Sequence, residues 1–199
     1  MLLDINTFGG RVDAAVAMRD TLLNAPVRTI AYVNQRAISA GALIALACDT
    51  LIMTEGGTIG AATPVVSGGS DETKPADEKS VSYVRKEFRA TAEVRKRPPE
   101  FAEAMVDADV EIAGVVAKGK LLTLTASEAL EHKVAELTAP TVDAALTAAG
   151  IAGADSMKTG WLAFKLSLPF LATGLIVGLV VSILQEAPKI QEMTLMFIH

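Results

Sequence analysis

The sequence is poor in the side chains that most often bind metals or form covalent cross-links. Among its 199 residues there is one cysteine, Cys48, and there are two histidines, His132 and His199. A single cysteine excludes an internal disulfide and any site with several thiolate ligands. Neither histidine has a partner at the spacing of a zinc site. The sequence therefore predicts no metal and no cofactor. Cys48 ends the apolar run 42–48 and is expected to be a packed core thiol.

Basic residues are also few, and they are scattered along the chain. Lys and Arg number 18 against 23 Asp and Glu, which gives a net charge of −5. A nucleic-acid-binding surface needs clustered Lys and Arg to neutralise phosphates. The basic run Arg95-Lys96-Arg97 is expected to be a solvated helix end. This composition argues against nucleic acid as the main partner.

Short β-rich runs alternate with segments of helical periodicity over the first 150 residues, which indicates an α/β domain. The predicted strands are residues 1–6, 27–33, 50–54 and 58–61, and the predicted helices are 12–24, 39–48, 79–95, 100–116 and 142–149. The sequence Thr125-Ala-Ser-Glu128 is typical of a capping box that starts a further short helix. Between these elements, residues 64–78 are polar and lack periodicity. This segment is expected to be a mobile loop that orders when a substrate or partner binds.

The C-terminal part contains one long apolar stretch, from Trp161 to Leu184, with Lys165 as its only charge. About 20 apolar residues are needed to cross a bilayer as a helix. A buried core helix is the alternative, but the rest of the chain is too small to surround such a segment. The expected organisation is a domain over 1–153, a linker over 154–160, a single transmembrane helix over 161–185 and a tail over 186–199.

Ser39 is the first candidate for chemistry. It stands in Ala37-Ile38-Ser39-Ala40-Gly41, directly before a very apolar helix. Free N–H groups at a helix start can stabilise an oxyanion, so the N–H of Ala40 is a candidate oxyanion donor beside a Ser39 nucleophile. Many serines at this position only cap their helix, and the residues alone leave both possibilities open.

The pair Gly9-Gly10 follows the first predicted strand. Glycines let a backbone approach a ligand closely, so this turn is a candidate for the second oxyanion donor. An ordinary strand-to-helix turn is the alternative interpretation.

A serine nucleophile needs a base, and both histidines are badly placed for this role. His132 is expected to be exposed beyond the helix that the capping box starts, and His199 is the last residue. Lys79 begins a helix after the polar segment, where a lysine shielded from water could take the proton of Ser39. On the residues alone, an exposed lysine beside Lys74 with no chemical role is the favoured interpretation.

Three blocks in this order resemble the NfeD family of membrane-bound serine proteases: Asp4-Ile-Asn-Thr-Phe-Gly-Gly-Arg-Val-Asp-Ala, Ile38-Ser-Ala-Gly-Ala-Leu-Ile-Ala-Leu and Leu124-Thr-Ala-Ser-Glu-Ala-Leu. The resemblance covers roughly residues 1–150. It implies an α/β fold of the ClpP/crotonase-like type, followed by a membrane segment. It also implies a Ser39/Lys79 dyad, with Gly9, Gly10 and Ala40 at the oxyanion hole.

The resemblance further implies cleavage of hydrophobic segments, with stomatin-like membrane proteins as partners. It implies a single-pass membrane protein whose protease domain lies on the extracytoplasmic side. The fold commonly buries an apolar helix face between subunits, so a homo-oligomer is expected.

The chain departs from the family pattern at Phe8, where a proline usually precedes the two glycines, and at Lys133, where a glycine is frequent. It also opens at a strand that is internal in the family, so we expect an N-terminally incomplete domain.

Other interpretations within the same fold fit the sequence less well. ClpP itself would need a histidine near residues 62–64, and signal peptide peptidase A is longer and anchored at its N-terminus. An acyl-CoA enzyme of the crotonase group would use a Glu or Asp base and bind coenzyme A. A catalytically silent membrane scaffold would keep the fold and bind a stomatin-like partner without cleaving it.

Overall fold

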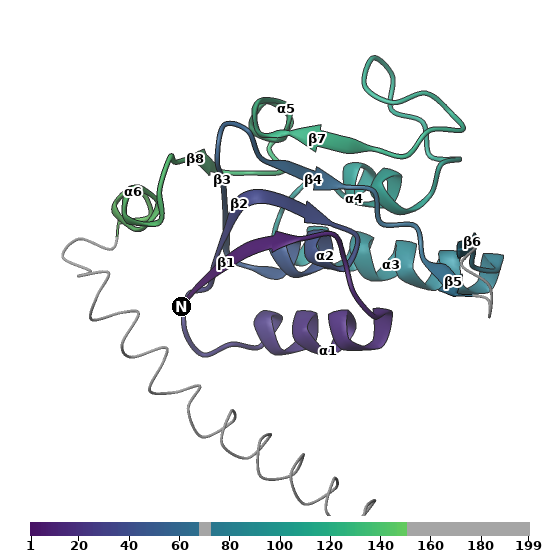
Figure 1. Ribbon diagram of the computed structural model, residues 1–199, viewed down its shortest axis with the longest axis horizontal. Helices are drawn as coiled ribbons and strands as arrows, with labels where there is room; N and C mark the ends of the chain where they lie inside the picture. The colour runs from purple at the N-terminus through teal and green to yellow at the C-terminus, as the bar shows by residue number, and fades with distance from the viewer. Residues whose placement is uncertain (68–72, 151–199) are drawn as a thin grey trace, which may run out of the picture. The chain divides into compact units, whose positions relative to one another are not determined.

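Residues 1–67 and 73–150 are described by the computed structural model, in which a six-stranded sheet carries helices on both faces (Figure 1). The strand order is β7-β4-β2-β3-β8, and β1 pairs with the remaining edge of β2. The strands are β1 (Leu2–Thr7), β2 (Ile30–Ile38), β3 (Thr50–Met53), β4 (Thr58–Gly60), β7 (Thr123–Thr125) and β8 (Leu137–Thr138). All pairs are parallel except β4 with β7. The expected α/β class is therefore confirmed.

Strand β2 is the centre of the sheet and is shifted from its predicted position, since it spans Ile30–Ile38 rather than 27–33. Its first half pairs with β3, and Arg36–Ile38 pair with β4 on the same side. The polar residues at positions 34–36 interrupt the apolar pattern and lie where the β1–β2 register shifts, and pairing resumes at Arg36 with β4 and at Ala37 with β1. Ser39 consequently follows the last residue of β2 directly.

Six helices connect the strands within the described residues: α1 (Val12–Leu23), α2 (Ala40–Ala47), α3 (Glu78–Val94), α4 (Pro99–Val106), α5 (Ala126–Glu131) and α6 (Val142–Ala148). Helix α4 ends ten residues before its predicted end at position 116. The Asp107 carboxylate accepts the N–H of Asp109 at 2.9 Å and also pairs with Arg85. Such a local side-chain turn competes with helix continuation.

Alternate residues of the central strands face opposite sides, as the period of a strand requires. Ala31 and Val33 belong to the main core, which also contains buried residues of α1 to α5. Ile30, Tyr32 and Ile52 face a smaller cluster that contains Ala145 of α6. The main core thus lies on the face that carries the helices around Ser39.

The segment 64–78 contains a strand pair that the sequence analysis did not predict. Strand β5 (Val65–Ser67) pairs antiparallel with β6 (Thr73–Pro75), so the expectation of a wholly irregular loop is wrong. Helix α3 then begins at Glu78, and the side chain of Asp77 caps it by accepting the N–H of Ser80 at 3.0 Å.

The basic run at the end of α3 is not a solvated helix end. Arg97 is 3% exposed, and its guanidinium donates to the carbonyls of Leu46 at 2.8 Å and Cys48 at 3.0 Å. It also binds the Glu136 carboxylate at 2.9 Å. Lys96 turns the chain with a left-handed φ of 57°, which directs Arg97 inward. Arg97 therefore satisfies the free carbonyls at the end of α2.

Cys48 is fully buried, as predicted, and burial raises the pKa of its thiol to about 11. No helix within residues 1–67 and 73–150 is long and apolar enough to cross a membrane. The predicted linker, transmembrane helix and tail (154–199) lie outside the described residues.

Candidate active site

Ser39 forms a sharp junction between β2 and α2. Its backbone has φ 57° and ψ −120°, a left-handed conformation that L-residues other than glycine rarely adopt. A strained strand-to-helix turn of this kind presents a serine hydroxyl at the end of a sheet. Its side chain makes no capping hydrogen bond to α2, so the helix-cap alternative is not what the structure shows.

The backbone N–H of Ser39 donates to the carbonyl of Gly60 at 3.0 Å, which fixes the junction to the end of β4. Gly60 has φ +137°, and a Cβ built there would lie 2.4 Å from the Leu122 carbonyl oxygen. Only glycine fits this position. Gly60 was not predicted as a site residue, because the backbone that excludes a side chain there belongs to residue 122, far away in the chain.

Gly9 lies directly against Ser39. A Cβ at Gly9 would come 2.8 Å from the Cβ and 3.1 Å from the Oγ of Ser39, and Gly9 has φ +132°. Gly10 has more space, since a Cβ there would lie 3.8 Å from the Cβ of Ala40. The structure therefore brings Gly9, Gly10 and Ala40 to the candidate nucleophile, as the sequence analysis expected.

The N–H groups of the glycine turn have different environments. Gly9 donates to the Thr7 hydroxyl at 3.1 Å, so its N–H is occupied. Within the described residues, no acceptor takes the N–H of Gly10 or that of Ala40. These two groups are the available donors beside Ser39, and they can stabilise negative charge on a substrate oxygen.

Thr7 also anchors the turn to α2. A Cβ at Gly41 would lie 2.5 Å from the Thr7 methyl group, so β1 and α2 approach as closely as a glycine permits. Thr7 and Gly41 lie within the family blocks, but neither was predicted to have a role at the site. Their close packing could not be inferred from their spacing in the chain.

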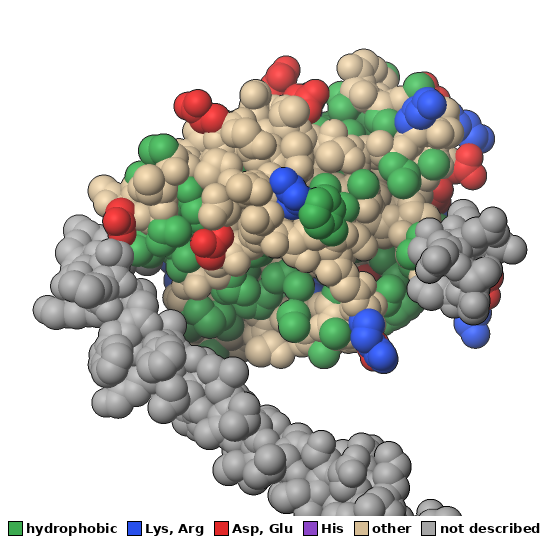
Figure 2. All heavy atoms as spheres, in the orientation of Figure 1, with side chains coloured by type: hydrophobic (Ala, Val, Ile, Leu, Met, Phe, Trp, Pro, Cys, Tyr) green, Lys and Arg blue, Asp and Glu red, His purple; other side chains and the backbone are tan. Residues whose placement is uncertain are grey.

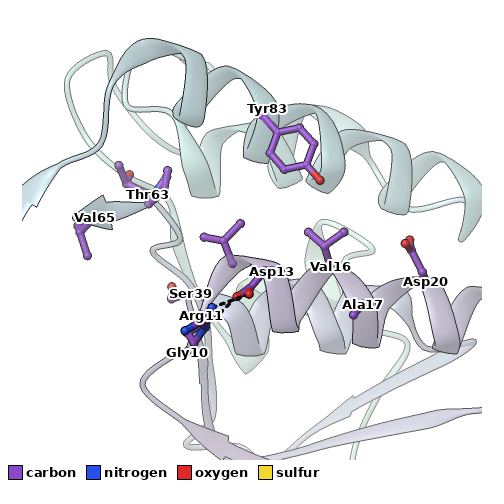
Figure 3. A pocket seen from close by; sticks show the side chains of 12 residues that line it. Gly10, Arg11, Asp13, Val16, Ala17, Asp20, Ser39, Thr63, Val65 and Tyr83 are labelled. Carbon is purple, nitrogen blue, oxygen red and sulfur yellow. Dashed lines mark hydrogen bonds and ion pairs between the residues drawn. The ribbon is translucent and has the colours of Figure 1, made fainter. Parts of the chain in front are cut away.

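A cleft of about 870 Å³ opens beside Ser39 between α1 and α3. Figure 3 shows Tyr83 of α3 facing Val16 of α1 across it, with Ser39 and Gly10 at one end. The described residues that line it come from the glycine turn, α1, the segment after β4 and α3: Gly10, Arg11, Val12, Asp13, Val16, Ala17, Asp20, Ser39, Thr63, Pro64, Val65 and Tyr83. The cleft is long enough along α1 to hold several residues of an extended chain.

A small apolar cavity of about 20 Å³ lies beneath the cleft next to Ser39. Its walls include Leu43 of α2, Ala62, and Val84 and Phe88 of α3. At this volume the cavity has room for about one water-sized group next to Ser39.

The charged pair nearest to the glycine turn is Arg11 with Asp13, whose atoms Nη2 and Oδ2 lie 2.7 Å apart. The hydrogen bond from Arg11 lowers the pKa of the Asp13 carboxyl to about 2. Asp13 is therefore ionised at neutral pH, and its pairing with Arg11 leaves little net charge at this end of the cleft.

Lys79 lies apart from the other predicted site residues. It is exposed in the first turn of α3 and is not among the described residues that line the cleft. Tyr83, which does line the cleft, follows one helical turn later, so both residues share one side of α3. The structure thus places Lys79 next to the rim of the cleft rather than against Ser39.

His132 is half-buried at the end of α5, where its ring lies 4.7 Å from that of Phe101. The expectation that it is exposed is wrong, since the aromatic contact shields it. It is not among the residues that line the cleft.

Comparison with known families identifies the domain. The family model of the NfeD1b N-terminal domain matches residues 1–159. The chain belongs to this family. A second model, that of bacterial export proteins of family 3, matches residues 156–199. The NfeD resemblance inferred from the three sequence blocks is confirmed.

Two curated relatives support the NfeD1b assignment. The chain is 37% identical over 193 residues to "Membrane protein NfeD1b" of Bacillus subtilis, with 92% of this chain and 43% of the relative covered. It is 28% identical over 146 residues to "Membrane-bound protease PH1510" of Pyrococcus horikoshii, with 70% of this chain and 30% of the relative covered. The chain therefore spans less than half the length of either relative.

Solved structures give the same relationship. A serine-to-alanine mutant of the 1510-N membrane-bound stomatin-specific protease matches with a TM-score of 0.63 and 26% identity, over 73% of this chain and 67% of that one. A lysine-to-alanine mutant of the same protease, in complex with a substrate peptide, matches with a TM-score of 0.64 and 26% identity. This match covers 73% of this chain and 63% of that one. The α/β protease fold that the resemblance implied is thereby confirmed.

Proposed function

We propose that this domain is a serine peptidase in which Ser39 is the nucleophile and Lys79 the general base. The observation that carries the proposal is the strained junction at Ser39, next to two N–H groups without acceptors among the described residues. Strain of this kind persists where the surrounding structure imposes it, and it is concentrated at functional sites. The relationship of this domain to proteases supports a peptide bond as the bond that is cleaved.

In the proposed reaction, the neutral amine of Lys79 takes the proton of the Ser39 hydroxyl as Oγ attacks the substrate carbonyl carbon. The N–H groups of Gly10 and Ala40 donate to the oxyanion. Collapse of this intermediate breaks the peptide C–N bond, and the lysine returns the proton to the leaving amine. Water then hydrolyses the ester on Ser39 and restores the free serine.

For this reaction the side chain of Lys79 must turn from solvent into the cleft. Its place one turn before Tyr83 supports this movement, because it lies on the cleft side of α3. A peptide bound in the cleft would cover the lysine in this position and exclude water from it.

Exposed apolar side chains surround the proposed site. The exposed fractions are 39% for Val12, 58% for Val65 and 50% for Tyr83, which all line the cleft, and 55% for Val66, which follows Val65. Such apolar groups at a cleft mark a surface that binds an apolar partner. We therefore propose hydrophobic segments of membrane-associated proteins as substrates, with stomatin-like proteins as the first candidates.

The names of the relatives support a membrane location. We propose a single transmembrane helix over 161–185 that tethers the domain on the extracytoplasmic side, and a homo-oligomeric assembly. Alkaline carbonate extraction of cell membranes tests the anchor: the full chain should stay in the membrane fraction, and a chain that ends at residue 150 should be released.

The dyad is tested by hydrolysis of a fluorogenic peptide with apolar residues and by labelling with a fluorophosphonate probe. Ser39→Ala should abolish both, because it removes the nucleophile. Lys79→Ala should abolish hydrolysis, and the double variant should be no worse than either single variant, because the two groups act as one unit.

Lys118→Ala, which removes an exposed lysine away from the cleft, is the matched control and should keep full activity. Hydrolysis that survives Ser39→Ala would exclude the proposed nucleophile. A folded parent chain that neither hydrolyses the peptide nor is labelled at Ser39 would instead favour a silent scaffold.

A further inference from the structure

The turn that carries the Gly10 donor has few side chains to hold it. Gly9 and Gly10 have none, so the anchors on its β1 side are the two residues before them, Thr7 and Phe8. Thr7 packs inward against Gly41 and accepts the N–H of Gly9. Thr7 thus holds the inner face of the turn. Phe8 is the residue on the β1 side that can hold its outer face.

Phe8 is 76% exposed, but one face of its ring is covered. The guanidinium carbon of Arg36 lies 4.5 Å from the centroid of the Phe8 ring. This distance is within the range of a cation–π interaction, for which the planar guanidinium of arginine is well suited. Figure 2 shows patches of apolar side chains on this face of the molecule, with charged side chains scattered between them and along its edge.

Arg36 shares the Gln35 side chain, its neighbour in β2, with Asn6 of β1. Thr7 pairs with Ala37 in the β1–β2 register, which puts Phe8 beside the end of β2. The Gln35 side-chain oxygen accepts from Arg36 Nη2 at 3.3 Å and from the Asn6 amide at 3.4 Å. Within the described residues Arg36 forms no ion pair with a carboxylate, so its contacts are with Gln35 and the Phe8 ring.

We propose that Arg36 is a positioning residue for the oxyanion turn. Its guanidinium, stacked on Phe8, holds Gly9 and Gly10 in the conformation in which the Gly10 N–H lies beside Ser39. Thr7 holds the inner side of the same turn. The catalytic part of this inference depends on the proposed peptidase function, whereas the ordering of the turn does not.

An exposed cation–π pair is expected to shift the equilibrium of the turn about two- to five-fold. Because the turn acts on the oxyanion and not on the bound peptide, its loosening should lower kcat and leave KM unchanged. A purely structural surface residue would not produce this split.

The experiment compares Arg36→Gln, Phe8→Leu and the double variant in the full chain. Two readouts are measured: kcat with the fluorogenic peptide, and hydrogen exchange of the Gly9 amide, which the Thr7 hydroxyl protects. Each single variant should lower kcat about two- to five-fold and speed Gly9 exchange by a similar factor. The double variant should show no further change, since either single variant already removes the stack.

Phe8→Trp keeps an aromatic face for Arg36 and should retain both kcat and protection. Lys118→Gln removes a positive charge away from the cleft and should change neither. Independent, additive effects of Arg36→Gln and Phe8→Leu would overturn the inference, as would unchanged Gly9 exchange in Arg36→Gln. Faster exchange with unchanged kcat would show a held turn that does not serve the reaction, which also overturns it.

Failure of the proposed function is separate from failure of this inference. If Ser39→Ala retains hydrolysis, the peptidase proposal fails. The exchange measurements then still decide whether Arg36 holds the turn.

Discussion

At the scale of single residues, the two adjacent glycines of the site have different structural requirements. Gly9 combines a left-handed φ with direct contact to Ser39, whereas Gly10 has neither. The role of Gly9 is to leave room for Ser39, and the role proposed for Gly10 is to donate its N–H.

We therefore expect Gly9→Ala to lower peptide hydrolysis by roughly 10²-fold or more, because its methyl group would displace Ser39 from its position. Gly10→Ala should stay within a few-fold of the parent activity, since it keeps the N–H and its Cβ would make an ordinary contact with Ala40. Initial rates and circular dichroism of both variants test this. Equal losses in two folded variants would contradict the separate roles.

At the scale of elements, the ends of α3 and α5 are built in the same way. In each, a lysine with a left-handed φ follows the last turn: 57° at Lys96 and 58° at Lys133. After α5, Lys133 donates to the Leu130 carbonyl at 3.1 Å and Val134 donates to the Ala129 carbonyl at 2.8 Å. This is the Schellman pattern, in which glycine is the favoured residue.

Lys133→Gly should therefore raise the free energy of unfolding by about 1 kcal/mol, because it removes the left-handed strain of a residue with a side chain. The measurement is the urea unfolding midpoint. Lys118→Gly is the matched control: Lys118 has no left-handed φ, so glycine there should bring no gain. A destabilised Lys133→Gly variant would show that the lysine stem contributes more than its backbone strain costs.

At the scale of the whole molecule, ionised carboxylates connect elements that are distant in the chain. Glu103 of α4 binds Lys86 at 2.6 Å and Arg89 at 2.8 Å, both on α3. Burial raises the pKa of the Glu103 carboxyl, but hydrogen bonds from Lys86 and Arg89 outweigh it, so the pKa is lowered. Asp49 is similar: burial opposes ionisation, while hydrogen bonds from Thr29 and the charge of Arg95 lower its pKa.

A carboxyl with a lowered pKa in the folded state stabilises the fold above the pKa of the unfolded chain, about 4. This stabilisation is lost as the pH falls through the folded value. The unfolding free energy should therefore be level from pH 7 to about 5 and fall below about pH 4. Urea midpoints across this range measure it, and Glu103→Gln should flatten the acid decline. A midpoint that stays constant down to pH 2.5 would contradict the role of these carboxylates.

The α/β class, the strand-to-glycine turn, the serine at the start of α2 and the capping box at Thr125 could all be predicted from the amino-acid sequence. Each depends on residues that are neighbours in the chain, so local periodicity and turn chemistry are sufficient to predict it. The capping box is present as expected, with the Glu128 carboxylate 2.8 Å from the Thr125 N–H. The order of the family blocks also identified the NfeD relationship, because it records the same local elements.

The tertiary structure alone decided the strained backbone of Ser39, the space at Gly9 and the position of Lys79 at the rim of the cleft. These features depend on contacts between distant residues, such as Ser39 with Gly60 and Thr7 with Gly41. The same is true of Arg97, which looks like a surface charge in sequence but caps α2 from the core. Packing across the sheet creates these requirements, and no local pattern of residue types encodes which distant backbone a side chain will meet.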